Sequence, residues 1–392
     1  MRKKFLIAIS FLLLLIVIFH SHLRLGLLSA FFLWDLMDEA GVQSPHRGAL
    51  AWITRTPSVS VVSIPVDDRT IKADLYHRPD MKQKAAILLT HGIIESGKDD
   101  PRLIRFALSL ARCGFVVLVP ELRGMKSLRI LLSDVDDIVA SYRFLRSLER
   151  EVDREKMGLM GFSYGAGPTF MAASRPSIRH QVKFVVSFGG YYTPLNLIRF
   201  ITTGHFQYGD EEGYLKPEPY GKWVFFINNL NYVESKEDRR ILQGIFREEQ
   251  MGGIKNSEKF QKLHKSLSDE GRALYGLLVN KDPAQVEGLF RQTDARFRDY
   301  LQKISLESVV PSIDAYFLMG HGTADPLIPY TETLRLADAV EDESRVHLAI
   351  LRMFTHVDPN RRKFKVVENF TVYLPSMFRF FYFVYDLLGQ RE

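Results

Sequence analysis

Cysteine is nearly absent from this chain of 392 residues. Cys113 is its single cysteine, which excludes an internal disulfide framework and a zinc site built from cysteines, and leaves the redox compartment open. The chain also lacks a run of Lys and Arg interleaved with aromatic residues, so we expect no nucleic-acid partner. The formal net charge of +6 is typical of a solvated surface, with attraction to anionic lipid as the alternative.

Other signals of ligand chemistry are missing as well. No set of His, Asp and Glu residues has convincing metal-ligand spacing, and Gly92 and Gly97 do not form a phosphate-binding loop. Hydrophobic residues make up 46% and charged residues 25%, as in ordinary globular proteins. We therefore expect one large domain with an insertion, and neither a metal nor a cofactor.

The first 34 residues carry most of the membrane signal. Three basic residues precede an apolar run from Phe5 to Phe19, which is short of the ~20 residues that span a bilayer. A second apolar stretch, Leu25 to Trp34, could extend the membrane contact. The best cleavage candidate, Leu28-Ser29-Ala30, has Leu where a small residue is required. Residues 1–34 therefore predict an uncleaved single-pass membrane anchor with the catalytic domain extracytoplasmic; a cleaved signal or a buried helix are the alternatives.

Residues 35–57 have the composition of a linker, and residues 58–190 alternate between strand and helix patterns. Period-two patterning predicts a hairpin from Ser58–Ile64 and Ile71–Tyr76. Helical spacing is found at Pro101–Arg112 and Leu128–Leu148. Continuous apolar runs predict strands buried on both faces, as in parallel sheets, at Ala85–Thr90, Phe115–Val119, Met157–Met160 and Val182–Phe188.

The alternation stops at residues 191–311, which we expect to form an all-helical lid. Its candidate helices are Lys222–Val233, Lys236–Glu249, Ser257–Leu278 and Gln285–Lys303. The strand and helix pattern resumes over residues 312–392, with strands at Ala315–Met319 and His347–Met353 and a helix at Leu334–Val340. The aromatic closing segment Phe364–Leu388 is expected to cover the sheet, with bilayer contact as the alternative.

A Gly-x-Ser-x-Gly pentapeptide, Gly161 to Gly165, follows the predicted strand that ends at Met160. This pattern is typical of a nucleophile elbow, a strained strand-to-helix turn that exposes the oxygen of its serine, here Ser163. We expect Gly161 and Gly165 to be required because a side chain at either position would collide where strand and helix pass closely. The pentapeptide alone is weak, since roughly 0.1 chance matches are expected in a chain of this length.

A serine nucleophile needs a histidine base, and the histidine needs a carboxylate. Asp325 follows the strand that ends at Met319, and His356 follows the next strand, so both are expected at the same edge of the sheet as Ser163. Non-catalytic alternatives remain open. Ser163 would then be a small buried turn residue, Asp325 a helix cap, and His356 a surface histidine, with His321 and His347 as rivals.

The chain from about Val59 onward resembles the α/β-hydrolase superfamily, nearest to its dienelactone-hydrolase, prolyl-oligopeptidase-like and serine esterase branches. The matching motifs occur in order: Thr90-His91-Gly92, Glu121-Leu122-Arg123-Gly124, Val152-Asp153 with Lys156 to Gly167, and His321-Gly322-x-x-Asp325-x-x-x-Pro329. The resemblance implies Ser163 as nucleophile, Asp325 as acid and His356 as base, in the chain order of such triads. It also implies an oxyanion hole from the backbone amides of Ile93 and Tyr164.

The sequence thus predicts a membrane-anchored serine hydrolase acting on a small, apolar carboxylic ester. A peptidase or thioesterase of the same fold is one alternative, and a non-catalytic membrane-tethered binding protein is another. Relatives usually carry Asp where this chain has Glu121, a change of little consequence because that residue is generally structural. Residues 191–311 match no cap that we can name, so substrate choice does not carry over from the resemblance. Oligomeric state is also left open.

Overall fold

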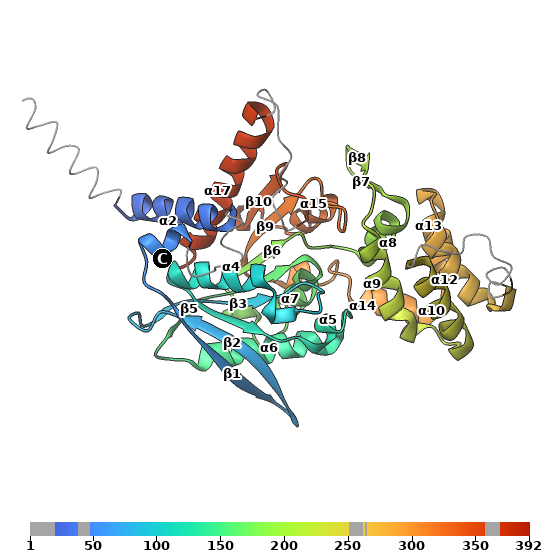
Figure 1. Ribbon diagram of the computed structural model, residues 1–392, viewed down its shortest axis with the longest axis horizontal. Coiled ribbons are helices and arrows are strands. Elements are labelled where there is room, and N and C mark those ends of the chain that lie inside the picture. The colour runs from blue at the N-terminus through green and yellow to red at the C-terminus, as the bar shows by residue number, and fades with distance from the viewer. Residues whose placement is uncertain (1–19, 38–47, 251–261, 263–264, 357–368) are drawn as a thin grey trace, which may run out of the picture.

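The computed structural model describes residues 20–37, 48–250, 262, 265–356 and 369–392 (Figure 1). An eight-stranded sheet with strand order β1-β2-β4-β3-β5-β6-β9-β10 forms its centre. Strand β2 is antiparallel to β1 and β4, and every other neighbouring pair is parallel, which confirms the expected mostly parallel sheet. The strands are β1 Ser58–Val66, β2 Arg69–His77, β3 Lys84–Thr90, β4 Val116–Pro120, β5 Val152–Phe162, β6 Phe184–Phe188, β9 Tyr316–Gly322 and β10 Val346–Leu351.

Helices cover both faces of this sheet. One face packs against α2 (His20–Met37), α4 (Pro101–Arg112) and α17 (Leu374–Gly389), whereas the other packs against α6 (Leu132–Ser147) and α7 (Ala166–Ala173). Successive side chains of β3 therefore enter two different apolar cores: Ala86 and Leu88 face α6, while Ile87 and Leu89 face α4. Burial on both faces explains why the central strands are continuously apolar in sequence.

Helix α4 has the bounds that its sequence predicts because signals at both ends agree. The Asp100 carboxylate caps the first turn by accepting the Arg102 backbone N–H, and Pro101 occupies the first helical position. Gly114, just beyond the helix, has a φ of +102° that favours glycine. By contrast, α6 begins at Leu132 rather than at the expected Leu128, whose own φ is +59°.

The sequence predicts that residues 191–311 are all-helical, and this prediction is wrong. Strands β7 (His205–Tyr208) and β8 (Glu211–Tyr214) form an antiparallel hairpin whose turn contains Gly209 at a φ of +56°. The expected helix over 285–303 is divided because the Asp294 side chain caps a new helix. Among the described residues, the α-helices of this insertion are α8 Pro194–Thr203, α9 Pro219–Asn229, α10 Lys236–Gln250, α12 Asp269–Val279, α13 Val286–Arg291 and α14 Ala295–Lys303.

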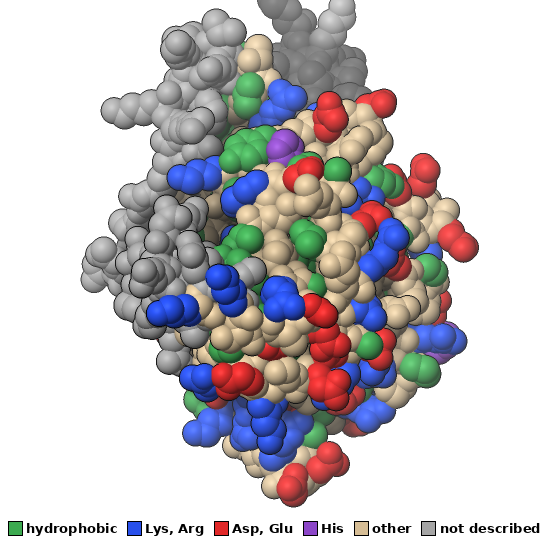
Figure 2. Space-filling model, turned by 90° about the vertical axis from the view of Figure 1, so that its right-hand side faces the viewer, with side chains coloured by type: hydrophobic (Ala, Val, Ile, Leu, Met, Phe, Trp, Pro, Cys, Tyr) green, Lys and Arg blue, Asp and Glu red, His purple; other side chains and the backbone are tan. Residues whose placement is uncertain are grey.

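The insertion projects from one end of the sheet and turns a charged face outward. Figure 1 shows α10, α12 and α13 on the right, away from the strands. Figure 2, which views the molecule from that side, shows acidic and basic side chains intermixed with small apolar areas. The inner side chains of the insertion, such as Phe226 and Leu277, belong to the same apolar core as α6 and α7.

Helix α2 contains the stretch Leu25–Trp34. One face of it buries Leu28 and Phe32 in the apolar core that also holds α17, whereas Leu27 and Trp34 are 60% and 58% exposed. The helix continues past residue 34, and the Asp35 carboxylate accepts the Leu50 backbone N–H at 3.2 Å. Within the residues described here, no helix is long and apolar enough to cross a membrane. Residues 5–19, where the anchor is expected to begin, lie outside the described residues.

Candidate active site

Ser163 occupies a strained turn between β5 and α7. Its φ is +54°, in the left-handed region that non-glycine residues rarely adopt. A short 3-10 turn, Ser163–Gly165, follows β5 and leads directly into α7. This is the strand-turn-helix context that the pentapeptide requires to be a nucleophile elbow.

The two glycines of the pentapeptide are required for the reason that the sequence suggests. A Cβ on Gly161 would lie 2.5 Å from the Cα of Ala166, at the start of α7. A Cβ on Gly165 would lie 2.2 Å from the backbone oxygen of His91, which follows β3. Both neighbours are backbone atoms and cannot move aside, so the turn closes only with glycine at both positions.

Asp325 and His356 are hydrogen-bonded partners. Nδ1 of His356 lies 2.5 Å from Oδ2 of Asp325. The other carboxylate oxygen, Oδ1, accepts the backbone N–H groups of Leu327 at 2.8 Å and Ile328 at 3.0 Å. The carboxylate is therefore fixed in one orientation, and the His356 ring is held by its Nδ1 atom.

The charge on Asp325 is stabilised despite complete burial. Burial alone would raise the pKa of this carboxyl, but the positive charge of His356 and hydrogen bonds from His321 and His356 outweigh it and hold the pKa at about 2. Asp325 is thus a carboxylate throughout the neutral pH range. It can hold the His356 tautomer that leaves Nε2 free to accept a proton.

His321, one rival for the role of base, is fully buried at the end of β9. Its Nδ1 lies 2.6 Å from the Thr333 hydroxyl, and its Nε2 lies 3.1 Å from Oδ2 of Asp325 and 2.9 Å from the Ile328 carbonyl oxygen. Both ring nitrogens are occupied by protein atoms. His321 therefore supports Asp325 and does not reach the pocket.

His347, the other rival, lies within β10 as the sequence predicts. Its Nδ1 is 2.7 Å from Oδ2 of Asp386 on α17. This bond ties the edge strand to the closing helix, and His347 does not line the pocket of Ser163.

A cavity of about 500 Å³ brings the predicted residues together, since Ser163, His356, Ile93 and Tyr164 all line it. Most of its other walls are apolar. They come from α4, β5, the amino-terminal end of α9, the loop after Asp325, and α17, and include Leu103, Phe106, Phe162, Val224, Leu327, Phe380, Phe383, Val384 and Leu387.

The loop after β3 places Ile93 next to the serine. A Cβ on Gly92 would lie 3.3 Å from the Cβ of Ser163, so the two turns are in close contact. His91 shapes the loop: its Nδ1 lies 2.7 Å from the Gly92 carbonyl oxygen, and its Nε2 accepts the Leu122 N–H at 3.2 Å. Burial lowers the pKa of His91, so the ring is neutral and can make both bonds.

Sequence reasoning missed several residues that shape the pocket. Gly189 has a φ of +68°, which favours glycine, and its Cα faces the His356 ring, since a Cβ there would lie 3.5 Å from that ring. Leu36 of α2 also lines the cavity, although its segment is expected to be a linker. Phe380 belongs to the aromatic segment that the sequence assigns to sheet cover; its regular spacing was the available signal.

One group of carboxylates lies elsewhere, in the insertion. Glu234, Glu270 and Asp294 offer oxygens within 4.8 Å of one another. Asp294 already accepts the backbone N–H groups of Glu234 at 2.7 Å and Arg296 at 2.7 Å, which accounts for it as a helix cap. None of the three residues lines the pocket of Ser163.

No family model and no curated protein matches the sequence. Similar solved structures include the acylaminoacyl peptidase of Pyrococcus horikoshii, at 15% identity over 82% of this chain and 42% of that chain, with a TM-score of 0.44. Est1E from Butyrivibrio proteoclasticus is 12% identical over 84% of this chain and 98% of that chain, with a TM-score of 0.48. A dienelactone hydrolase from Anabaena variabilis is 15% identical over 78% and 90%, with a TM-score of 0.41.

These likenesses are too distant to carry a conclusion about activity, and this chain spans less than half of the length of the peptidase. The fold is evident from the chain itself. Its mostly parallel sheet, the turn at Ser163 after β5, and Asp325 and His356 after the next strands are the features of a known architecture. The chain has an α/β-hydrolase fold, as its sequence motifs predict.

Proposed function

We propose that this protein is a serine hydrolase that cleaves carboxylic esters through an acyl-enzyme. The observation that carries the proposal is that Ser163, at a φ of +54°, lines one apolar cavity together with His356, whose ring is held by the buried Asp325. A strained serine with a neighbouring, carboxylate-held imidazole is the arrangement that activates a hydroxyl as a nucleophile.

In this mechanism Oγ of Ser163 attacks the carbonyl carbon of the ester while Nε2 of His356 takes the hydroxyl proton. Asp325 stays ionised and stabilises the imidazolium that forms. When the tetrahedral intermediate collapses, His356 gives its proton to the departing alkoxide, and the acyl group remains on Ser163. Water then attacks the acyl-enzyme by the same sequence, with His356 as base, and releases the acid.

The backbone amides of Ile93 and Tyr164 are the proposed donors to the oxyanion. Tyr164 lies in the turn that leads into α7, where backbone N–H groups point away from the helix. Ile93 follows Gly92, which is in close contact with Ser163. Removing one such donor typically costs about 3 kcal/mol of transition-state stabilisation.

An apolar acyl group fits the cavity best because most of its walls are aliphatic or aromatic. A carboxylic ester is favoured over a peptide, because the lining offers few polar groups to orient a peptide backbone. A thioesterase or peptidase of the same fold remains the alternative chemistry.

The test is hydrolysis of p-nitrophenyl butyrate by the wild type and by Ser163→Ala. We expect the variant to lose roughly 10³-fold or more in kcat. Ser177→Ala is the matched control, because Ser177 is exposed beyond α7 and should keep wild-type activity. Wild-type turnover by Ser163→Ala would refute the proposal, and a panel of butyryl ester, thioester and peptide substrates would rank the three chemistries.

A non-catalytic binding protein is the rival from another class. A fluorophosphonate reacts covalently only with an activated serine, so it separates the two possibilities without knowledge of the substrate. We expect labelling on the peptide that contains Ser163 and its loss in His356→Ala. An unlabelled wild-type protein would favour the binding role.

We further propose that the amino-terminal segment before His20 tethers the protein to a membrane and leaves the hydrolase domain extracytoplasmic. The support is the apolar run from Phe5 to Phe19 and the basic residues before it. Because α2 packs on the domain, the tether would end near His20. Protease digestion of a carboxyl-terminal epitope in sealed cells tests the orientation; a protected epitope would reverse it.

A further inference from the structure

The solvent side of α2 is apolar. Leu23, Leu27, Ala30 and Trp34 are all exposed, and their helical spacing places them on one stripe opposite the buried face. A helix on a protein surface normally turns charged and polar side chains toward water on this side. The one acidic residue of the helix, Asp35, is instead buried. Helix α2 therefore presents apolar side chains both to the core and to its surroundings.

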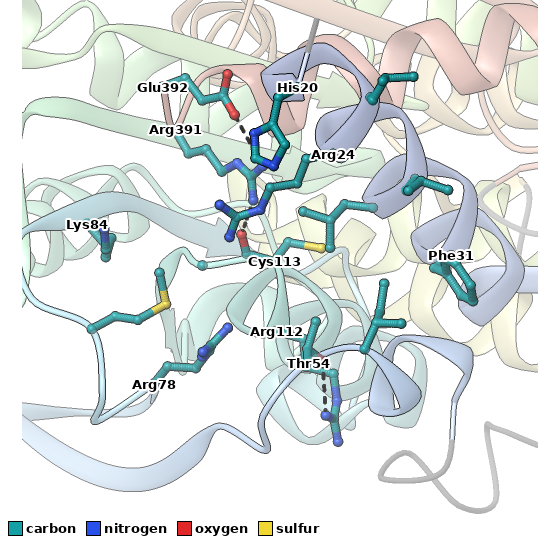
Figure 3. A pocket seen from close by; sticks show the side chains of 16 residues that line it. His20, Arg24, Phe31, Thr54, Arg78, Lys84, Arg112, Cys113, Arg391 and Glu392 are labelled. Atoms are coloured by element: carbon teal, nitrogen blue, oxygen red, sulfur yellow. Dashed lines mark hydrogen bonds and ion pairs between the residues drawn. The ribbon is translucent and has the colours of Figure 1, made fainter. Parts of the chain in front are cut away.

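Aromatic rings widen this stripe. Phe31 stacks on Trp34 with ring centroids 6.4 Å apart. Trp52, which ends the 3-10 turn η1 (Ala49–Trp52), meets Trp34 edge to face at 5.9 Å and is itself 72% exposed. Figure 3 looks into the hollow of about 560 Å³ beside the helix, with His20 near one end of α2 and Phe31 further along it. Two neighbouring indoles thus face outward at the edge of this hollow.

Helix α17 extends the apolar surface beside α2. The two helices contact each other, since Nδ1 of His22 lies 2.7 Å from the Tyr385 hydroxyl. Both pack on the same face of the sheet, so their outer sides point away from the strands (Figure 1). On α17 the outer side exposes two rings one turn apart, with exposed fractions of 62% and 60%. We call the following residues of the three elements the apolar face: Leu23, Leu27, Trp34, Trp52, Phe378 and Tyr382.

Two observations favour a lipid bilayer as the partner of the apolar face. Trp and Tyr are the side chains that gather at membrane–water interfaces, and none of the six residues is charged. The apolar run from Phe5 to Phe19 leads directly into His20, the first residue of α2, so the face begins where that run ends. A second copy of the chain could also cover the face, but the adjoining apolar run favours lipid.

We propose that the apolar face lies flat on a phospholipid bilayer, with its aromatic rings among the upper parts of the acyl chains. Helix α17 then lies between the lipid and the pocket of Ser163, which the opposite side of this helix lines with Phe380 and Phe383. This contact is more than a tether. A tether alone would allow α2 to stand upright, with Trp34 about 21 Å from His20 along the helix axis. The proposal does not depend on hydrolysis.

The test is quenching of tryptophan emission by brominated acyl chains, which requires contact between indole and chain. The sequence has three tryptophans, Trp34, Trp52 and Trp223, so three full-length proteins that each keep one of them and carry Phe at the other two can be compared. Trp223 lies on α9 in the insertion and is the control. Each protein is reconstituted into vesicles of phosphatidylcholine and phosphatidylglycerol, with and without bromine, and flotation measures the bound fraction.

We expect brominated vesicles to remove most of the emission of Trp34 and of Trp52 and to leave that of Trp223 unchanged. Leu27→Glu places a charge in the middle of the apolar face and should abolish the quenching of Trp34. Val61→Glu makes the same kind of change at a site on β1 that is 68% exposed, and should leave the quenching unchanged. Melting curves in detergent establish that all variants are folded.

A protein that floats with the vesicles but keeps the emission of Trp34 and Trp52 would overturn the proposal while leaving the tether in place. If that unquenched protein also sedimented as a dimer in detergent, the face would belong to a second copy. Equal quenching of Trp223 would overturn the proposal too, because the contact would not be specific to this face. A protein that did not float would overturn both this proposal and the tether.

Discussion

Nδ1 of His356 lies 2.5 Å from Oδ2 of Asp325, on two loops that follow neighbouring parallel strands. The bond determines which ring nitrogen carries the proton. Because Asp325 is fully buried and its pKa is held at about 2, the acceptor is charged whenever the protein is folded near neutral pH.

Replacing Asp325 by Asn should therefore disable the base without emptying the pocket. We expect kcat to fall by roughly 10³- to 10⁴-fold with little change in KM, because the amide neither fixes the tautomer nor stabilises the imidazolium. Hydrolysis of p-nitrophenyl butyrate measures this. Asp342→Asn, on an exposed turn, is the control. If KM rose instead and kcat stayed unchanged, Asp325 would have a role in substrate binding and not in the chemical step.

Gly165→Ala should damage the elbow. Its Cβ would lie 2.2 Å from the His91 backbone oxygen, so the turn or the loop carrying Ile93 must shift. We expect at least a roughly tenfold loss of kcat/KM and a lower melting temperature. Gly244→Ala is the matched control, because no atom lies within 4 Å of its Cβ position on α10. It should be neutral or stabilising by up to about 1 kcal/mol.

Val384→Phe tests the path of the acyl group. Val384 lies on the face of α17 that lines the pocket, and the larger ring would narrow the space for a long chain. We expect kcat/KM for p-nitrophenyl decanoate to fall roughly tenfold relative to the acetate ester. Val61→Phe, whose site on β1 is 68% exposed, should leave this ratio unchanged. If Val384→Phe left the decanoate-to-acetate ratio of kcat/KM unchanged, the acyl chain would lie elsewhere in the pocket, toward α9.

Asp134 should make stability depend on pH. Burial raises the pKa of this carboxyl to about 6; Oδ1 accepts the Gly124 N–H at 3.1 Å, and Oδ2 has no hydrogen-bond partner among the described residues. Below about pH 4 both the folded and the unfolded chain hold the proton. As the pH rises from about 4 to 6, the unfolded chain releases this proton while the folded chain still holds it. The free energy of unfolding therefore falls over this range, by an amount on the order of 3 kcal/mol.

Denaturant unfolding at pH 4.5 and pH 7.5 measures the effect. Asp134→Asn cannot ionise, so its free energy of unfolding should improve relative to the wild type as the pH rises. Asp136→Asn, exposed on the same helix, should follow the wild type at both values. A constant difference between Asp134→Asn and the wild type would show that Asp134 does not titrate in this range.

Local signals explain why so much of the sheet was predictable. Strands β3 and β4 are continuous apolar runs, and α4 has a cap at Asp100 and a glycine just past its end. The hairpin β7–β8 was missed because its strands have only four residues each and bury little. The turn glycine, Gly209, was the signal for it.

Tertiary partners explain the rest. An apolar helix such as α2 has the same composition whether lipid or α17 covers Phe32, and only the fold distinguishes the two environments. The pairing of Asp325 with His356 followed from strand order. The contact between His321 and Asp325 could not be predicted from strand order, because it requires the loop between the two residues to turn back so that their side chains meet.

The insertion leaves the sheet and returns to it at nearly one point. The Leu306 backbone N–H donates to the Tyr192 carbonyl oxygen at 3.0 Å, and the Tyr191 hydroxyl donates to the Ile304 carbonyl oxygen at 3.0 Å. A segment closed in this way can be lengthened, shortened or exchanged without moving the strands that carry Ser163 and Asp325. Changes in the insertion can thus alter which substrates reach the pocket while the positions of Ser163 and Asp325 stay the same.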